Sequence, residues 1–360
     1  MNDENNDILN RDSILENLTR TLLYEGYSLF PYHRNAIKNQ KPIPFGVVYP
    51  TDYCACNEHA HAEMITDCIV SGDKNLRINI DVRFLHLIKT EILGKEINDS
   101  EEDGFIPVYE LIVNEKSHQQ GWQTIERKIS SGDIPVAYLA DKRILLPFSF
   151  AENFENENIY DEHGKIAGKK IASRSAIEGT VVIKAIPLES MENVYRVIVF
   201  INNYTPVMNA ANISRDEIFR QSFLSTNTVL NALNGEFISL QNPGKKWKSL
   251  IAECKNKDTW PILIEESNKT LLSSPIIVYD YPKINPKSKG DLFDSLEIEE
   301  ALMLHFSVMS DEEKQKIAQS DEKLRAMLSK VSQVTPDDII SLHGGFTDLS
   351  QSKLNNDKED

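Results

Sequence analysis

The sequence lacks the short motifs that mark the common nucleotide-binding and hydrolytic enzymes. It contains no Gly-x-x-x-x-Gly-Lys-Ser/Thr loop, no Gly-x-Gly-x-x-Gly turn, no Gly-x-Ser-x-Gly elbow and no His-Glu-x-x-His helix. Each of these motifs places a phosphate-binding backbone, a nucleophile or a zinc ion at a defined point of a fold. Their absence removes most of the support for nucleotide-dependent enzymes and for the standard hydrolases.

Cysteines and long apolar runs are also scarce. Four cysteines in 360 residues are too few for a disulfide scaffold, so we expect a reduced, cytoplasmic protein, with pairing of Cys54 or Cys56 with Cys68 left open. No window approaches about 18 uncharged apolar residues, so no transmembrane helix is expected. Residues 1–7 are acidic and polar, unlike the start of a signal peptide.

Positive charge is in deficit as well. The chain has 39 Lys and Arg against 55 Asp and Glu, a formal net charge of −16. Nucleic acids and anionic membrane surfaces both attract Lys/Arg clusters, so we expect neither as a partner. Hydrophobic residues make up 41% and charged residues 26%, which is typical of a folded globular protein of one large domain or two smaller ones. The oligomeric state does not follow from the sequence.

The hydrophobic pattern predicts an α+β protein, with an antiparallel β-sheet or sandwich in residues 40–205 and a helical C-terminal region. Apolar and polar residues alternate over residues 77–84, as in a half-buried strand. The turn-forming run at 71–75 before it predicts a hairpin with residues 62–70. Further strands are expected at 106–113 paired with 122–129, at 143–150, at 179–186 paired with 195–202, at 261–265 and at 269–279.

Helical periodicity and capping residues occur near the N-terminus and through the last third of the chain. They predict helices at residues 13–25, 214–223, 245–255, 290–309, 311–331 and 335–343. The resulting organisation is a disordered tail at 1–10, a mainly antiparallel β module with an N-terminal helix at 11–150, a polar loop or linker at 151–176, an α+β module ending in helices at 177–347 and a disordered tail at 348–360.

Residues 54–68 hold three of the chain's four cysteines and two of its eight histidines, which are side chains that bind transition metals. Cysteine, histidine and glutamate in one short segment suggest zinc or iron. The candidate ligands are Cys54, Cys56, His59, His61, Glu63 and Cys68.

The spacing divides these candidate ligands into two sets. In an extended chain His59, His61 and Glu63 share a face, which would supply three ligands and leave a position open for water. The cysteines have the opposite parity, so only a loop could gather all six side chains. The simpler interpretation is a polar hairpin loop with incidental Cys and His, in which Cys68 is a small buried hydrophobe.

Three segments carry a resemblance: Tyr-Glu-Gly-Tyr-Ser-Leu-Phe-Pro-Tyr at 24–32 with Ala-Ile-Lys-Asn at 36–39, Ser-Ser-Pro-Ile-Ile-Val-Tyr-Asp-Tyr-Pro at 273–282, and Gly-Asp-Leu-Phe-Asp at 290–294. They resemble a bacterial protein family of uncharacterised function that is associated with gene clusters for nickel–iron hydrogenases. The similarity extends over most of residues 14–343. It implies no established activity and no catalytic residues.

One further match bears on the candidate metal ligands. The family's Met-x-Thr-Glu-Cys segment is similar to Met-Ile-Thr-Asp-Cys at 64–68, with Asp67 in place of Glu. That pattern includes none of Cys54, Cys56, His59 and His61. The resemblance therefore draws attention to Cys68 and weakens a family-wide metal role for the others.

Two functions follow as hypotheses. The first is a cytoplasmic accessory or assembly protein that acts by protein–protein interaction, with a metalloenzyme such as a hydrogenase as its partner. Its expected contact surfaces are the aromatic segment near Phe30 and the C-terminal helices. The second is a metal-dependent enzyme with His59, His61 and Glu63 as ligands and one of the cysteines as a further ligand or nucleophile.

Overall fold

Strands account for most of the structure. The computed structural model describes residues 45–95, 104–188 and 191–282, and within them 56% of residues are in strands and 9% in helices. The predicted α+β class with a helical C-terminal region is therefore wrong, because the helices of the described part are short and its strands form one large antiparallel sheet. The helices expected at 13–25 and from residue 290 onward, and both expected tails, lie outside the described residues.

The described elements occupy one compact unit that ends at Tyr281. The strands are β1 Glu63–Lys95, β2 Phe105–Val108, β3 Glu110–Val113, β4 Lys116–Gln119, β5 Gly121–Ser130, β6 Ile134–Pro135, β7 Ile144–Phe150, β8 Asn153–Tyr160, β9 Ile166–Arg174, β10 Ile177–Pro187, β11 Val194–Asn203, β12 Leu224–Phe237, β13 Trp260–Leu263 and β14 Thr270–Ser274. The helices are α2 Thr51–Cys54, α3 Val136–Asp141, α4 Arg215–Arg220 and α5 Lys248–Ile251.

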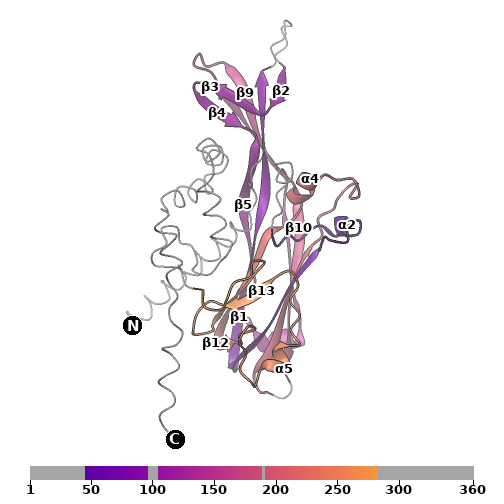
Figure 1. Cartoon of the computed structure of the whole chain (residues 1–360), viewed down its shortest axis with the longest axis vertical. Coiled ribbons are helices and arrows are strands. Elements are labelled where there is room, and N and C mark those ends of the chain that lie inside the picture. Colours follow the sequence, from indigo (N-terminus) through magenta and orange to yellow (C-terminus); the bar gives the residue numbers. More distant parts are fainter. Residues whose placement is uncertain (1–44, 96–103, 189–190, 283–360) are drawn as a thin grey trace, which may run out of the picture. The chain divides into compact units, whose positions relative to one another are not determined.

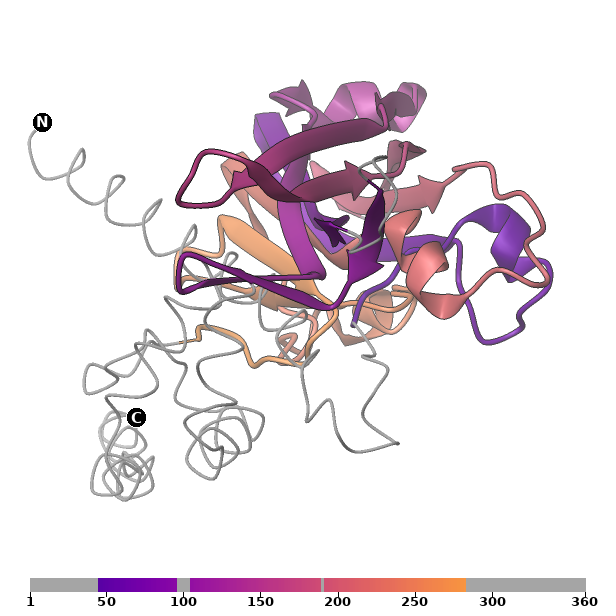
Figure 2. The same cartoon turned by 90° about the horizontal axis from the view of Figure 1, so that it is seen from above.

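Twelve strands form one antiparallel sheet around β1 (Figure 1, and from above in Figure 2). The main path runs β13-β14-β12-β1-β11-β10-β7, while β2, β5, β6 and β9 pair with further stretches of β1. The expected pairing of residues 179–186 with 195–202 is confirmed by β10 and β11. Because β11 and β12 both pair with β1, strands of the two modules expected at 11–150 and 177–347 belong to one sheet.

The expected hairpin at residues 62–84 is wrong, because the chain continues through it as the single 33-residue strand β1. The turn-forming residues form a bulge: Gly72 pairs with Gly235 and Arg77 with Leu233, so residues 73–76 lie opposite Asn234 alone. A Cβ atom on Gly72 would lie 2.4 Å from the Asn234 carbonyl oxygen, which explains the glycine. The turn-forming residues are therefore accommodated in a bulge, and the chain does not reverse its direction there.

The expected pairing of residues 106–113 with 122–129 is also wrong. The first segment divides into β2, which pairs with the end of β1, and β3, which pairs with β4. The second segment is β5, which pairs with β1 from Asp81 to Thr90. A sequence pattern marks which residues are extended, but it does not name the neighbouring strand.

Residues 151–176, expected as a polar loop or linker, instead contain the hairpin of β8 and β9. This hairpin extends the far end of β1, where β9 pairs with residues 89–94 and β2 with residues 92–95. We call β8, β9, residues 89–95 of β1, β2 and the β3–β4 hairpin the distal sheet. Its own small core consists of Ile92, Val108, Leu111, Val113, Ile159 and Ala167.

The main core lies between β7, β10 and β11 on one side and β1 and β12 on the other. Phe84 of β1 stacks on Phe223 with ring centroids 4.6 Å apart and lies 5.8 Å from the ring of Phe148 on β7. Strands β1 and β7 are not paired, so the sheet must fold over itself to bring these rings together. Each fully buried side chain of this size contributes roughly 1.5–3 kcal/mol, so the core stabilises the fold of β1.

We find no helix within the described ranges with the length and apolar character needed to cross a membrane.

Candidate functional site

The segment with the candidate metal ligands begins in a short helix and an exposed turn. Cys54 is the last residue of α2, and burial raises its pKa to about 11. Cys56 is exposed, and the side chain of His59 is 95% exposed beside Glu58. These residues line an open pocket of about 520 Å³ together with Ala55 and Asn57. The elevated pKa keeps Cys54 a protonated thiol near neutral pH, which disfavours it as a nucleophile.

The next two candidate ligands, His61 and Glu63, lie beside neighbouring residues of one loop, Asp258 and Lys257. His61 Nδ1 lies 2.5 Å from Asp258 Oδ2, and Glu63 Oε1 lies 3.9 Å from Lys257 Nζ. His59, His61 and Glu63, predicted to share a face, thus each have a different acidic or basic neighbour. Over the stretches that the structure describes, no three His, Cys, Asp or Glu side chains are grouped so that they could hold a metal ion.

Cys68 lies in the main core rather than with the other candidates. It is fully buried, and its Sγ donates to the Val197 carbonyl at 3.8 Å. Burial raises the pKa of Cys68 well above its ordinary value. This placement matches the interpretation of Cys68 as a small hydrophobe. All four cysteines are free thiols, so neither Cys54 nor Cys56 forms a disulfide with Cys68.

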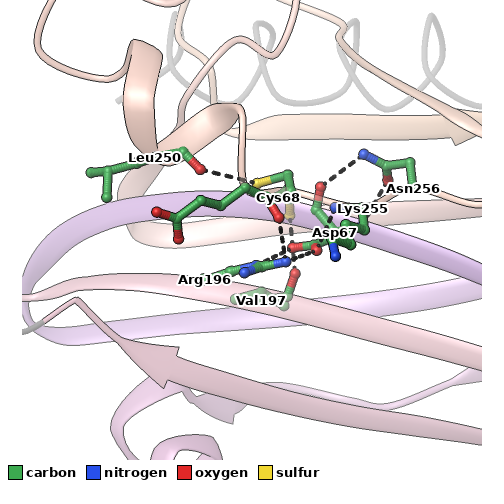
Figure 3. Close-up of polar contacts among 9 residues, drawn as sticks. Asp67, Cys68, Arg196, Val197, Leu250, Lys255 and Asn256 are labelled. Carbon is green, nitrogen blue, oxygen red and sulfur yellow. Dashed lines mark hydrogen bonds and ion pairs between the residues drawn. The ribbon is translucent and has the colours of Figure 1, made fainter.

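The residue beside Cys68 forms the densest polar contact of this region (Figure 3). Asp67 is 1% exposed and receives a two-point interaction from Arg196 of β11, with Nε donating to Oδ1 at 2.8 Å and Nη2 to Oδ2. The backbone N–H of Lys255 also donates to Oδ2, at 2.7 Å. Arg196 Nη2 donates in addition to the Glu253 carbonyl at 2.7 Å. These bonds fasten the loop at residues 253–258 to β1 and β11.

The side chain of Asn256, in the same loop, forms the hydrogen bonds to the Asp67 backbone that a neighbouring strand would otherwise supply. Its Oδ1 accepts from the Asp67 backbone N–H at 2.8 Å, and its Nδ2 donates to the Asp67 carbonyl at 3.1 Å. Two residues earlier on β1, Ile65 forms a backbone bridge with Lys257. The loop therefore satisfies the hydrogen-bonding edge of β1 on the side away from β11.

This arrangement is a structural brace, because it holds the loop at residues 253–258 against β1 and β11. The carboxylate of Asp67 accepts hydrogen bonds from a guanidinium and a backbone amide, so its oxygens are directed at the protein itself. Burial, and next the negative charge of Asp67, raise the pKa of Cys254 to about 12, so this thiol stays protonated beside the pair. Sequence reasoning missed both Asp67 and Arg196, and the Asp67 position within the Met-x-Thr-Glu-Cys match was the signal that could have found them.

A buried hydroxyl group joins the two segments of the resemblance that fall within the described residues. Thr66 Oγ1 donates to Ser273 Oγ at 2.8 Å, and Ser273 Oγ lies 2.7 Å from Thr259 Oγ1. Thr66 belongs to the segment at 64–68 and Ser273 opens the segment at 273–282. Residues that are 207 positions apart in the chain are thus direct neighbours.

Comparison of the chain with protein-family models, with curated proteins and with solved structures found no match in any of the three.

Proposed function

We propose that the chain is a cytoplasmic accessory or assembly protein that binds a protein partner through its distal sheet. The observation that carries this proposal is the gathering of large exposed apolar side chains on the small distal sheet. A contiguous patch of exposed apolar side chains is a typical mark of an interaction surface. The aromatic segment near Phe30 and the C-terminal helices, the other expected contact surfaces, lie outside the described residues.

The exposed side chains come from most strands of the distal sheet. Ile112 of β3 and Phe154 of β8 are each 67% exposed. The others are Ile106, Tyr109, Tyr160 and Ile166. Aromatic residues supply much of the contact energy of protein interfaces, because they bury a large area with few rotatable bonds. The distal sheet therefore offers several anchors for a protein surface.

The edge of the distal sheet supports the same proposal. Among the described strands, β8 pairs with β9 alone, so its other side can accept an added strand. Glu152, Glu155 and Glu157 are exposed on or beside β8. This negative charge favours a partner segment that carries Lys or Arg among apolar residues.

The class of partner rests on the family resemblance. A family associated with nickel–iron hydrogenase gene clusters favours a metalloenzyme subunit as the partner. An accessory role needs a binding surface rather than a catalytic centre, which is consistent with the brace-like chemistry around Asp67.

A pair of matched variants tests the proposal. The full chain is used to recover partners from native extract by cross-linking, and each recovered protein is then purified and titrated calorimetrically. Ile112→Glu/Phe154→Glu places charge on the distal sheet. Tyr204→Glu/Met208→Glu makes the same change at two exposed side chains outside the distal sheet. We expect the first variant to bind at least about tenfold more weakly and the second to bind like the unmodified chain.

Three results would contradict parts of the proposal. If no purified protein binds the chain, the accessory function is wrong. If a partner binds the Ile112→Glu/Phe154→Glu variant with unchanged affinity, the distal sheet is not the contact surface. If the partner that binds is not a metalloenzyme or one of its subunits, the partner class is wrong.

A further inference from the structure

A buried histidine lies where β1 passes from the main sheet to the distal sheet. His86 follows the last residue of β1 that pairs with β12, Leu85, and precedes the first that pairs with β9, Lys89. It exposes none of its surface. Neither of its ring nitrogens has a hydrogen-bond partner of acceptable geometry within the described part of the chain. Buried polar groups are nearly always paired, so the described residues leave the ring nitrogens of His86 short of well-placed partners.

Three arginines from three different elements surround this ring. Arg127 is on β5, where it pairs with Phe84 while His86 pairs with Ile125, so Arg127 and His86 are diagonal neighbours on one face. Arg174 ends β9 and Arg220 ends α4. All three guanidinium groups act on the ring: burial first, and then the charges of Arg127, Arg174 and Arg220, lower the pKa of His86 to about 4. The main chain of Ser175 lies close enough to oppose this shift in part.

Within the described residues each guanidinium has a defined contact, but an ion pair with a carboxylate is formed by Arg220 alone. Arg127 Cζ lies 4.1 Å over the ring centroid of Phe150, and its buried Nε has no partner in the described residues. Arg174 Nε donates to the Ala151 carbonyl at 3.5 Å. Burial and the neighbouring charge of Arg174 lower the pKa of Arg127, which indicates that these two like charges lie close together.

Arg220 has the acidic partner of the group. Its Nη1 lies 2.9 Å from Glu217 Oε2, its Nη2 donates to Ser173 Oγ at 3.2 Å, and its buried Nε has no partner among the residues described. Three positive arginines and one negative glutamate leave a net charge of +2 around a neutral His86. All three arginine residues are partly exposed.

We propose that His86, Arg127, Arg174 and Arg220 form a binding site for a tetrahedral dianion, a phosphate or sulfate group. Guanidinium groups bind such anions through paired N–H donors, and a dianion matches the net charge of +2 that the three arginines and Glu217 carry together. The neutral imidazole donates one N–H to the bound oxyanion and so satisfies its buried nitrogen. The anion also removes the repulsion between Arg127 and Arg174.

The site adjoins the distal sheet through Arg174, the last residue of β9, but it uses none of the exposed apolar side chains on which the proposed partner surface rests. A failure of anion binding would therefore leave the accessory function standing, and the reverse also holds.

Calorimetric titration of the full chain with inorganic phosphate tests the site, at constant ionic strength set with chloride. Parallel titrations use sulfate, acetate and glycerol phosphate. We expect saturable binding of phosphate and sulfate and much weaker binding of acetate, a monoanion. Glycerol phosphate binding as tightly as phosphate would assign the site to a phosphorylated small molecule, whereas its exclusion would assign it to the free ion.

Variants connect the binding to these residues. Arg127→Gln should weaken phosphate binding about tenfold or more, because it removes a charged donor, while Arg127→Lys should weaken it less. Arg143→Gln, at an exposed arginine before β7, is the control and should leave the affinity unchanged. Circular dichroism checks that each variant is folded.

A measurement on the unmodified chain keeps the test independent of variant folding. Sulfate, which stays a dianion in the acid range where His86 titrates, should raise the pKa of His86, followed by the NMR chemical shift of its ring, because a bound dianion stabilises the imidazolium. Phosphate should shift the same ring signals near neutral pH. The proposal is overturned if phosphate binds no better than chloride, if Arg127→Gln and Arg143→Gln bind phosphate equally, or if the His86 ring does not respond to phosphate.

Discussion

Asp67 and Arg196 form a two-point ion pair between neighbouring strands, with the Arg196 Nε 2.8 Å from Asp67 Oδ1. Arg196 lies opposite Ile69 in the β1–β11 register, two residues along from Asp67, so the pair is diagonal across the ladder. Both side chains are mostly buried, at 2% exposure for Asp67 and 19% for Arg196. This geometry makes the pair sensitive to the loss of either partner.

Removing the arginine should destabilise the fold strongly. Arg196→Met leaves the Asp67 carboxylate buried without its main partner, and breaking a buried pair in this way costs about 3–5 kcal/mol. Urea unfolding should therefore show a lower midpoint for Arg196→Met. In the double variant Asp67→Asn/Arg196→Met, which removes both charges of this pair, part of the loss should be recovered.

A surface ion pair supplies the control for the Arg196 variant. Lys89 and Glu91 lie 2.7 Å apart but are more than a third exposed, so Lys89→Met should cost less than about 1 kcal/mol. An unfolding free energy for Arg196→Met that is no lower than that of Lys89→Met would show that Asp67 is not the brace described above.

The buried His86 should make stability depend on pH. Burial and then Arg127 lower its folded pKa from 6.5 to about 4, so the unfolded chain binds more protons between these values. Stability should therefore be fully present above about pH 6.5 and fall as the pH drops toward 4. The difference of about 2.5 pKa values corresponds to roughly 3 kcal/mol.

The measurement compares unfolding free energies of the unmodified chain and His86→Gln across this pH range, in phosphate-free buffer. As the pH falls, the unfolding free energy of the unmodified chain should decrease relative to that of His86→Gln, because glutamine at this position has no proton to take up. His163→Gln, at an exposed histidine in the turn between β8 and β9, is the matched control variant. Parallel curves for the unmodified chain and His86→Gln would show that His86 is not held in its neutral form.

The metal content separates the accessory protein from the metal-dependent enzyme. His61 pairs with Asp258, Glu63 lies near Lys257, and His59 is exposed, so we expect no stoichiometric zinc or iron in untagged protein. Elemental analysis of the unmodified chain and of His59→Ala/His61→Ala checks this. A stoichiometric metal that is lost in the double variant would favour the enzyme and count against a purely accessory role.

Local patterns were sufficient where one strand face or one capping residue decides the structure. The alternation at 77–84 lies within β1, and the strands expected at 179–186 and 195–202 pair as β10 and β11. Ser214 caps α4 by accepting from the Glu217 backbone N–H at 3.2 Å. In each case the signal is a property of residues within a few positions of one another.

The same patterns failed where burial comes from both sides. Strand β12 was not predicted, because Ser225, Thr226, Asn227 and Thr228 look like a polar loop although all four are buried. They lie in a central strand, between β1 and β14, that has no solvent-facing side over these residues. Local hydrogen bonds satisfy part of this polar surface: Asn227 Nδ2 donates to the Ser225 carbonyl at 2.8 Å and Thr226 Oγ1 to the Phe223 carbonyl at 3.4 Å. Asn227 Oδ1 and Thr228 Oγ1 have no partner among the described residues.

By itself, the sequence determined which stretches are extended, that 54–68 holds the chain's densest set of potential metal ligands, and that basic clusters are missing. Only the tertiary structure decided that these ligands separate, with His61 and Glu63 turned to a loop and Cys68 to the core. It alone brought Arg196 to Asp67 and three arginines to His86, because those neighbours come from strands and loops far apart in the chain. Side-chain alternation specifies a face of a strand, whereas the partner on that face depends on which strands pair and in what register.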